Sequence, residues 1–463
     1  MRILQVNHKI PPFSRQGSEQ HCLHLSQALA AQGHDVGVFH ISNTRHRRPY
    51  RLEQRNGDGL RIFHCIDGGG FSRLADWPNP FLRRAFRQTL QTFAPEVVHF
   101  HNYLSLGDPV VTMARDFGAA VVYTLHDYGL ICPNHLLLQT DGRLCDKADP
   151  GFFGGCCPLG VRSRGGRTPL VAKHVPPLPR WERFAARQSN PLARSLLAAG
   201  VWLAKRLVGE PAETAFAAKR DFFLGRTREI LETAHVLIAP SRFLRERFVQ
   251  CGVPPERIVH QCYGLRLCDR RAHQPSADGR PRFGYLGGFH PHKGIDVLVR
   301  GFAGLAGRAS LHLHGSSFGS PMSEAYFRQA TAGLCDGVTV HGPYANDDIA
   351  AILSRLDALV VPSVWHENSP LTIQEAQVAG VPVITSDHGG MAELVRDGID
   401  GRLFRLGDSA DLGRVLRELI EQPAELDRLR RNAPAVPSIA QTSAEIVALY
   451  RSALERARSC ACA

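Results

Sequence analysis

Hydrophobic residues recur along the chain as short apolar runs separated by amphipathic stretches. Met1 to Val6 form one such run, Glu19 to Ala31 repeat apolar positions with helical spacing as far as Gly33, and Asp35 to His40 form another run. A strand, a helix and a second strand in so short a stretch predict a βαβ unit, whose two strands are parallel. Further buried strands are predicted at residues 61–65, 97–101, 120–125 and 235–240.

The same rhythm returns after a polar segment. Residues 266–282 contain two prolines and one glycine and have no apolar period, which indicates a linker. Beyond it the pattern predicts a second doubly wound α/β domain, and an amphipathic helix from Gln441 to Arg458 ends the chain. The predicted strands of this second domain lie at 283–287, 310–315, 338–342, 358–363 and 382–386. The expected organisation is a first domain over 1–265, the linker over 266–282, a second domain over 283–435, and a helix with a tail over 436–463.

Between about 130 and 230 the strand pattern breaks, and we interpret this region as an insertion in the first domain. It includes a stretch rich in Gly, Pro and Arg at 163–180 and a helical stretch from Leu192 to Leu207. Four of the chain's 12 cysteines also fall there. A tetrahedral thiolate site would stabilise a segment with few large apolar residues, so a structural zinc is one hypothesis. The spacing lacks C-x2-C pairs, and packed thiols are the alternative. The four residues are Cys132, Cys145, Cys156 and Cys157.

Composition adds limits on the class of protein. The 463 residues suffice for two domains, and 44% hydrophobic with 21% charged residues is typical of a folded globular chain. The first ten residues lack the apolar core of a secretory signal, and no apolar run reaches the roughly 18 residues that span a bilayer. We therefore expect a cytoplasmic protein, with peripheral contact to the inner face of the membrane as a further option.

The chain is basic, with 55 Lys and Arg against 43 Asp and Glu and a formal charge of +12. The excess fits either solvated arginine faces or attraction to anionic ligands such as nucleoside diphosphates and phospholipid surfaces. No basic stripe with interleaved aromatic residues occurs, so we expect no nucleic-acid partner. The loop after the first predicted strand has no G-x-G-x-x-G, and the chain has no G-x-x-x-x-G-K-[ST]. These absences argue against nicotinamide dinucleotide enzymes and P-loop enzymes.

The most informative segment is residues 360–384, VVPSVWHENSPLTIQEAQVAGVPVI. A predicted strand leads to Glu367, a helix is expected to begin near Pro370, and Glu375 follows about two helical turns after Glu367. Carboxylates accept hydrogen bonds from vicinal diols, so one glutamate fits a sugar and the other a ribose. The N–H groups of the helix's first turn form an anion site. Alternatively, both glutamates only favour the helix N-terminus electrostatically.

A second segment, residues 285–294 (YLGGFHPHKG), joins a strand to a helix through two glycines. Gly287 and Gly288 would let the backbone approach a diphosphate, and Lys293 would supply a positive charge. The alternative is that Lys293 is an ordinary solvated residue at a helix start.

Together these segments resemble glycosyltransferase family 4, whose members have the GT-B fold of two Rossmann-like domains facing a cleft. The matching residues are Pro362-Ser363, Glu367, Glu375-Ala376 and Gly380-Val381-Pro382-Val383-Ile384. The resemblance implies that Glu367 contacts hydroxyls of the donor sugar and that Glu375 binds the ribose. It also implies that Asn368, Ser369, Pro370 and Leu371 approach sugar and phosphate. Many relatives have an arginine where this chain has Gly288, so Lys293 would carry more of the diphosphate charge here.

Weaker matches fall in other loops. Gly17-Ser18-Glu19 resembles a loop of the family that approaches the sugar or acceptor. Thr124-Leu125-His126-Asp127 resembles the family's Thr-x-His-Asp, which makes His126 a candidate for contacting the donor sugar, although a lone histidine at a strand end is more often structural. His341-Gly342-Pro343-Tyr344 matches a stretch near the nucleotide base, and residues 239–243 match in a role that we interpret as structural.

By resemblance, the chain is an enzyme that moves a hexose from an NDP-sugar to an acceptor with retention of configuration, without a catalytic metal or cofactor. The candidate catalytic residues are Glu367, His126 and Lys293. The acceptor is unidentified, and lipid-linked and polysaccharide acceptors both fit. An NDP-sugar epimerase of the same fold and a non-catalytic sugar-nucleotide binding module are the two alternatives.

Overall fold

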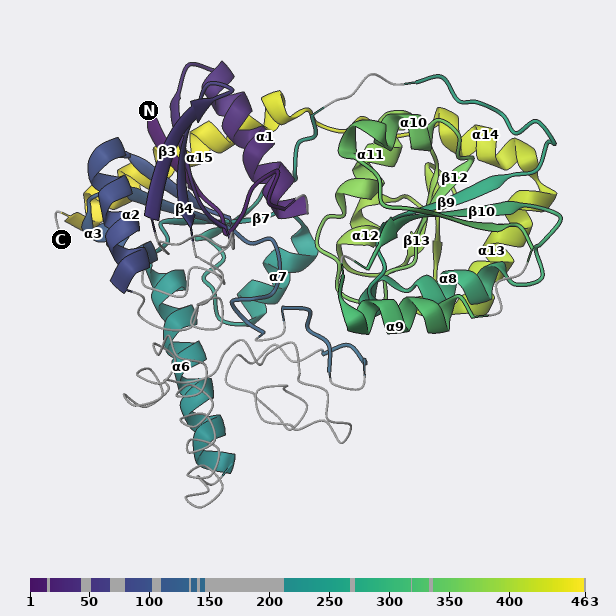
Figure 1. Ribbon diagram of the computed structural model, residues 1–463, viewed down its shortest axis with the longest axis horizontal. Helices are drawn as coiled ribbons and strands as arrows, with labels where there is room; N and C mark the ends of the chain where they lie inside the picture. The colour runs from purple at the N-terminus through teal and green to yellow at the C-terminus, as the bar shows by residue number, and fades with distance from the viewer. Residues whose placement is uncertain are drawn as a thin grey trace, which may run out of the picture.

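The computed structural model describes residues 1–14, 17–42, 51–66, 80–101, 110–132, 135–139, 142–145, 212–266, 271–317, 319–332 and 336–461. They form two α/β domains that lie side by side, each built on a mostly parallel sheet with helices on both faces (Figure 1). This confirms the predicted fold class. The stretches predicted at 163–180 and 192–207 lie outside the described residues, as do Cys156 and Cys157.

The first domain is organised around an eight-stranded sheet of order β3-β4-β2-β1-β5-β6-β7-β8. Every pairing in it is parallel except that of β3 with β4 at the edge. The sequence pattern missed β3, because its residues RLEQRNG are polar on both faces and mostly exposed, as an edge strand tolerates. The strands are β1 (Arg2–Val6), β2 (Asp35–Ser42), β3 (Arg51–Gly57), β4 (Leu60–Ile66), β5 (Val97–Phe100), β6 (Ala120–Thr124), β7 (Val236–Ala239) and β8 (Ile258–His260).

Side chains alternate between two apolar clusters on the two faces of this sheet. Along β1, Leu4 and Val6 belong to one cluster while Ile3 belongs to the other, as the period of two in a strand requires. Helices α2, α3, α6 and α7 contribute to the first cluster and α1 to the second. Their bounds are α1 (Gly17–Ala31), α2 (Pro80–Phe93), α3 (Val110–Asp116), α6 (Ala212–Thr233) and α7 (Arg242–Gln250).

The second domain has a six-stranded parallel sheet of order β11-β10-β9-β12-β13-β14, again with an apolar cluster on each face. Its strands are β9 (Arg282–Gly288), β10 (Ser310–Ser316), β11 (Val338–Gly342), β12 (Ala358–Val361), β13 (Val383–Ser386) and β14 (Gly401–Phe404). Its helical elements are η3 (Pro291–Lys293), α8 (Ile295–Phe302), α9 (Pro321–Ala330), η4 (Asn346–Asp348), α10 (Ile349–Leu353), α11 (Leu371–Ala379), α12 (Gly389–Leu394), α13 (Ser409–Glu421) and α14 (Pro423–Arg431).

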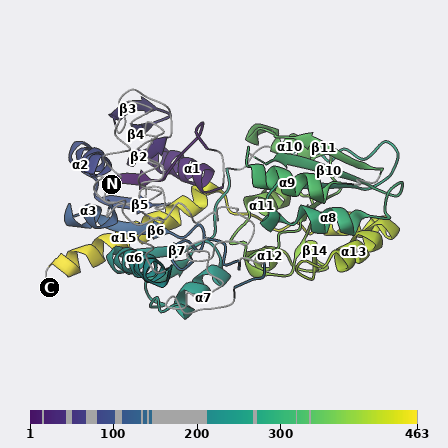
Figure 2. The same cartoon turned by 60° about the horizontal axis from the view of Figure 1, so that its bottom comes forward.

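The last helix, α15 (Ile439–Ala461), returns to the first domain and packs across its sheet beside α1 (Figures 1 and 2). The outgoing and returning chain segments are bonded where they cross, because Leu265 donates its N–H to the carbonyl of Pro437 at 3.0 Å and accepts from Ile439 at 2.7 Å. Gly264 allows this crossing. A Cβ there would lie 2.1 Å from Thr442 Oγ1.

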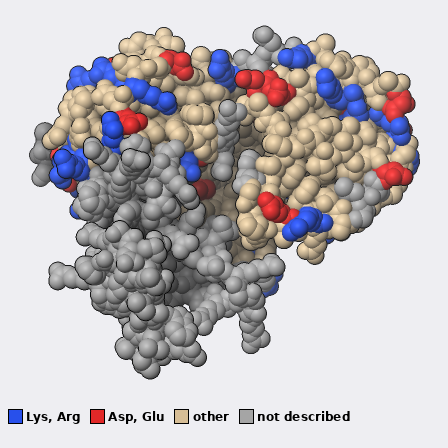
Figure 3. Space-filling view, in the orientation of Figure 1, with Lys and Arg blue, Asp and Glu red and all other residues tan. Residues whose placement is uncertain are grey.

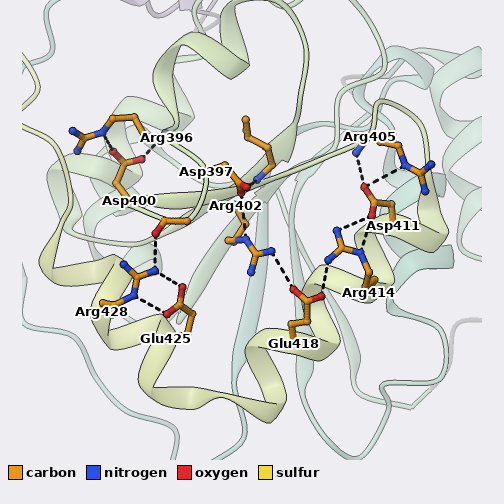
Figure 4. Close-up of polar contacts among 12 residues, drawn as sticks. Arg396, Asp397, Asp400, Arg402, Arg405, Asp411, Arg414, Glu418, Glu425 and Arg428 are labelled. Carbon is orange, nitrogen blue, oxygen red and sulfur yellow. Dashed lines mark hydrogen bonds and ion pairs between the residues drawn. The ribbon is translucent and has the colours of Figure 1, made fainter.

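Arginines on the surface of the second domain are held by acidic neighbours, as the close-up in Figure 4 shows. Arg402 of β14 bonds Glu418 of α13 at 3.1 Å, and Arg414 bonds Glu418 at 2.6 Å and Asp411 at 2.8 Å. Exposed pairs of this kind contribute about 0–1 kcal/mol each. These arginines thus link neighbouring elements, and their charge is balanced by acidic residues.

The close crossing predicts that Gly264→Ala is destabilising. The added methyl group would also lie 2.7 Å from both Ile439 Cα and Ser438 O, so the two crossing segments must separate. Such overpacking costs about 1–3 kcal/mol and should appear as a lower melting temperature. Gly225→Ala is the matched control, since nothing lies within 4 Å of a Cβ there. In that exposed helical position alanine should stabilise by about 0.5–1 kcal/mol. Equal effects of the two substitutions would contradict the analysis.

Candidate functional site

The loop that follows β12 lies at the carboxyl end of the second sheet and faces the first domain. Figure 3 shows the surface hollowed along the boundary between the two domains. In doubly wound sheets, ligands bind outside the carboxyl ends of the strands, which is where this loop lies. The predicted residues Glu367, Asn368, Ser369 and Pro370 all belong to it, and Leu371 begins α11.

Glu367 is buried and forms an ion pair with Lys293, which follows the neighbouring strand β9 of the same domain. Lys293 Nζ lies 2.6 Å from Glu367 Oε1, and Ser363 Oγ donates to the same oxygen at 2.8 Å. No described residue bonds Glu367 Oε2. The exposed fractions of the Lys293 and Glu367 side chains are 27% and 8%, so this is a largely desolvated pair with one edge open. Sequence analysis assigned these residues to sugar and diphosphate separately and did not predict their contact.

Glycines hold this loop tightly from two sides. Gly294, with φ of 70°, follows Lys293, and a Cβ there would lie 2.0 Å from Pro362 O. On the other side, Gly390 donates its N–H to Glu367 O at 2.9 Å, and a Cβ on it would lie 1.4 Å from Asn368 O. Gly390 was missed in the sequence, although the pair Gly389-Gly390 at the start of a helix is a signal of close backbone approach.

The Asn368 side chain joins the two domains. Its Nδ2 donates to the carbonyls of Leu125 at 3.1 Å and His126 at 3.3 Å. Its Oδ1 accepts from Ser241 Oγ at 2.7 Å. Ser241 also caps α7 by accepting from Leu244 N. The resemblance implied that Asn368 approaches sugar and phosphate. Its side-chain amide is already hydrogen-bonded to the first domain, so the backbone of Asn368 is the part left to approach sugar and phosphate.

Two helix N-termini from opposite domains face each other beside this loop. A Cβ on Gly17, the first residue of α1, would lie 3.6 Å from the Leu371 side chain at the start of α11. The first N–H groups of a helix have no intrahelical acceptor and attract anions. The arrangement therefore concentrates positive potential at the boundary between the domains.

Glu19 keeps the loop before α1 in place. It is fully buried, with His8 Nε2 at 3.0 Å, and it accepts from Ser14 Oγ at 2.8 Å and Ser18 Oγ at 2.9 Å. Burial alone would raise its pKa, but the hydrogen bond and charge of His8 and the two hydroxyls together lower the pKa to about 2. Glu19 is thus a structural anion, and the charge that it adds is compensated within its own loop.

Glu375 lies on α11 in a contrasting environment. Burial raises its pKa to about 7. Burial also raises the pKa of Tyr344, and the nearby Glu375 adds to that rise. The structure thus brings together Glu375 and Tyr344, which the sequence had assigned to ribose and base. No described residue forms an ion pair with Glu375.

Gly287 and Gly288 end β9 next to β10. Gly287 has a φ of 153°, and a Cβ on the neighbouring Gly315 would lie 1.8 Å from Gly287 O. Gly288 O accepts from Tyr285 Oη at 2.7 Å. These glycines allow close packing within the sheet. Because they have no side chains, they also leave their own backbone, five to six residues before Lys293, uncovered.

His126 follows β6, and both of its ring nitrogens have protein partners. Its Nδ1 lies 2.6 Å from Tyr263 Oη and its Nε2 lies 3.1 Å from His101 Nδ1. Tyr263 and His101 were not singled out in the sequence, since they lie 137 and 25 residues away from His126. A sugar hydroxyl that binds this ring must share a nitrogen with one of them.

The cysteine hypothesis stays a prediction. Cys132 is buried in the first apolar cluster and Cys145 packs partly buried against it, while Cys156 and Cys157 lie outside the described residues. Among the residues that the structure describes, no group of three or more His, Cys, Asp or Glu side chains is placed to hold a metal ion. In the same part of the chain, no helix combines the length and hydrophobicity needed to cross a bilayer.

Family models match both domains. The model described as Glycosyltransferase Family 4 matches residues 15–148, and that described as Glycosyl transferases group 1 matches residues 280–422. The first match spans the loop of Gly17 and the His126 stretch, and the second spans Lys293, Glu367 and Glu375.

Similar curated proteins include the D-inositol 3-phosphate glycosyltransferase of Nocardia farcinica, 34% identical over 35% of this chain and 37% of that protein. The MMP alpha-(1->4)-mannosyltransferase of Mycolicibacterium hassiacum is 30% identical over 37% of this chain and 42% of its own length. Both alignments thus span less than half of the relative. The glycogen synthase of Mycobacterium tuberculosis is 24% identical over 94% of this chain and 89% of that protein.

Solved structures share the whole architecture at low identity. Anabaena Alr3699/HepE in complex with UDP and glucose has a TM-score of 0.62 at 17% identity, covering 98% of this chain and 100% of that one. Sucrose-phosphate synthase from Thermosynechococcus elongatus has a TM-score of 0.64 at 19% identity, covering 97% and 98%. These likenesses establish the fold.

The raised pKa of Glu375 predicts a pH-dependent effect of Glu375→Gln. The folded protein holds this carboxyl protonated up to a pH of about 7, whereas in the unfolded chain it ionises near 4.5. Between these values the folded state binds more protons, so stability falls as pH rises through the window. Glutamine removes the titration. The melting temperature of the variant relative to wild type should therefore be higher at pH 8 than at pH 5.

The matched control is Glu256→Gln, which alters an exposed glutamate. Its melting temperature relative to wild type should be the same at both pH values. Differential scanning calorimetry of the three proteins at pH 5 and pH 8 makes the comparison. A Glu375→Gln difference that does not change with pH would refute the burial of an unpaired carboxyl.

Proposed function

Since the chain belongs to the glycosyltransferases of the family 4 type with the GT-B fold, we propose that it transfers a hexose from an NDP-sugar to an acceptor. The observation that best supports this proposal is the Lys293–Glu367 pair at the boundary between the domains. It offers a cation for a leaving diphosphate beside a carboxylate oxygen that no described residue bonds. We propose retention of configuration at the anomeric carbon and no catalytic metal.

The cation and the helix N-termini fit a leaving diphosphate. Lys293 and the opposed first turns of α1 and α11 place positive potential where negative charge develops as the sugar–phosphate bond breaks. In the structure, the Lys293 ammonium group is directed to Glu367. A bound diphosphate would share the ammonium group, whose three donors allow both contacts.

The carboxylates fit the neutral parts of the donor. Glu367 Oε2 would accept hydrogen bonds from sugar hydroxyls, while Glu375 would accept them from the ribose, with Tyr344 near the base. In the transfer step, the bond from the anomeric carbon to the diphosphate oxygen breaks and a bond to the acceptor oxygen forms on the same face. The acceptor proton passes to the departing diphosphate.

We propose a lipid-linked or a polysaccharide acceptor, since both fit the basic excess and the class of enzyme. Peripheral contact with an anionic membrane stays a prediction. Besides the basic excess, Arg-containing amphipathic stretches at 180–228 favour such contact, and residues 180–211 of them lie outside the described residues.

A thermal-shift screen against UDP-, GDP-, ADP- and TDP-sugars tests the donor class. A ligand present at about 100 times its dissociation constant stabilises the folded state by about 2.7 kcal/mol. Product analysis of the best donor without acceptor then separates the reactions. Slow release of nucleoside diphosphate supports a transferase, whereas conversion to an epimeric NDP-sugar indicates an epimerase. No shift with any NDP-sugar would refute the proposal.

Glu367→Gln should keep the fold and lose most activity. The substitution replaces a charged acceptor by an amide that cannot accept at both positions, and it removes the ion pair with Lys293. Loss of such a contact in the transition state costs about 2–4 kcal/mol, so turnover should fall by a factor of about 30 to 10³. Glu418→Gln alters a surface ion pair and serves as the control. Turnover of Glu367→Gln within about threefold of wild type would exclude Glu367 from the site.

Lys293→Ala should weaken binding of a nucleoside diphosphate much more than binding of the nucleoside. The substitution removes the cation and leaves the buried carboxylate of Glu367 without its charged partner, so both effects act against an anionic ligand. Calorimetry with UDP and uridine measures the difference. The double variant Lys293→Ala/Glu367→Gln removes the repulsion and should recover part of the UDP affinity. Equal losses for UDP and uridine would contradict the assignment.

A further inference from the structure

A continuous chain of hydrogen bonds runs through the buried polar side chains of the first domain. It begins at Tyr263 in the crossing segment, passes through His126 and His101, and continues to the carboxamide of Gln5 on β1. From Gln5 it goes on to Tyr450 of α15 and ends at the strands β5 and β6. The six bonds are Tyr263–His126 at 2.6 Å, His126–His101 at 3.1 Å, His101–Gln5 at 2.7 Å, Gln5–Tyr450 at 3.0 Å, Tyr450–His99 at 2.7 Å and His99–Thr124 at 2.7 Å.

The orientation of the Gln5 carboxamide determines which atom donates in each hydrogen bond between Gln5 and His126. Gln5 Nε2 donates to Tyr450 Oη, so Gln5 Oε1 must accept from His101 Nε2. A neutral imidazole carries one N–H, so His101 Nδ1 is then an acceptor. It follows that His126 Nε2 carries a proton and donates to His101, and that His126 Nδ1 accepts from the Tyr263 hydroxyl.

The hydrogen bonds on the other side of Gln5 follow from the same orientation of its carboxamide. Tyr450 Oη accepts from Gln5 and therefore uses its own proton toward His99 Nδ1, and His99 Nε2 donates to Thr124 Oγ1. Turning the Gln5 amide over would reverse every bond and move the proton of each ring to the other nitrogen. One carboxamide thus sets the tautomers of three histidines.

Neutral rings are consistent with the environment of the three histidines. Burial lowers the pKa of His99 to about 3 and that of His126 to about 4, and it holds the pKa of His101 well below the usual value. The nearby carboxylates of Asp127 and Glu19 oppose the shift of His126 without overcoming it. Each of these three imidazole rings therefore carries a single N–H proton.

His126 lies where the two domains and the crossing segment meet. Its carbonyl accepts from Asn368 of the second domain, and its ring is held by Tyr263, next to Gly264 at the crossing. The His21 ring packs against Tyr263 with centroids 4.5 Å apart, which limits movement of the phenol. A displacement of the crossing segment would therefore first alter the hydrogen bond between Tyr263 and His126.

From these contacts we infer that Tyr263 is a positioning residue that holds the His126 ring through Nδ1, so that His126, in the Nε2–H tautomer that Gln5 sets, meets the donor sugar as a hydrogen-bond donor. The inference rests on the proposed function for the identity of the ligand. The bond from His126 Nε2 to His101 is the longest of the six, so this N–H is the one most readily shared with an incoming sugar oxygen. The short bond from Tyr263 leaves Nδ1 unavailable.

The tautomer is tested without any ligand. In protein labelled with ¹⁵N in its histidine rings, the His126 signals are those missing from the spectrum of His126→Asn. We expect the proton on Nε2. A proton on Nδ1 would overturn the inference. In Tyr263→Phe the His126 Nδ1 signal should move toward that of a nitrogen without a hydrogen bond, while the proton stays on Nε2. An unchanged Nδ1 signal in that variant would also overturn it.

Function is tested with UDP and UDP-glucose, and Thr89→Val is the control, since it removes a buried hydroxyl on α2 that lies outside this chain of hydrogen bonds. Where the thermal-shift screen selects another NDP-sugar, that sugar and its nucleoside diphosphate replace UDP-glucose and UDP. Tyr263→Phe should slow the release of UDP from UDP-glucose in water on the order of tenfold, with UDP affinity within about twofold of wild type. Thr89→Val should keep the turnover of wild type. Equal turnover losses in both variants would reduce Tyr263 to a structural role. If wild type turns over none of the NDP-sugars of the screen, the proposed function fails while the tautomer result stands.

Discussion

The buried carboxylate of Glu367 is the constraint around which the second domain's loops are arranged. A carboxylate removed from water needs a charged partner, and only Lys293, 74 residues earlier in the chain, supplies one in the described structure. To bring it there, the turn at Gly294 must pass against Pro362, and Val364 bonds the carbonyl of His292 at 3.0 Å. The glycines on both sides of the loop follow from this need for close backbone approach.

The contact between the domains depends on the same loop. Asn368 follows Glu367 directly, and its amide bonds two carbonyls of the first domain and the Ser241 hydroxyl. Nearby, Glu393 of α12 accepts from the backbone N–H groups of Arg242 and Phe243 at the start of α7. The chain segment that carries the Glu367 carboxylate therefore also sets the position of the second domain against the first. Occupancy of the site and the relative position of the domains are thus physically linked.

The sequence predicted those features that depend on local patterns. Buried strands such as β6 and β12 and the helix after Pro370 follow from apolar runs and turn residues. The two glutamates were singled out because Glu367 precedes that helix and Glu375 follows about two turns later. Strand β3 was missed because an exposed edge strand needs no apolar alternation. The contacts of Tyr263 and Asn368 were also missed. They join residues more than a hundred positions apart, and no local periodicity records such pairings.

The two glutamates of the site differ in the way that their proposed roles require. Glu367 is buried with a cation and a hydroxyl on one oxygen, a setting that suits its proposed contact with the donor sugar. Glu375 is buried without a described charged partner, and its pKa near neutrality makes its charge state sensitive to whatever binds it. Ribose hydroxyls bonded to the carboxylate would favour ionisation and lower that pKa. In the proposed arrangement, the same residue type, eight positions apart, would provide an ion-paired carboxylate at one end of the donor and a ligand-responsive carboxyl at the other.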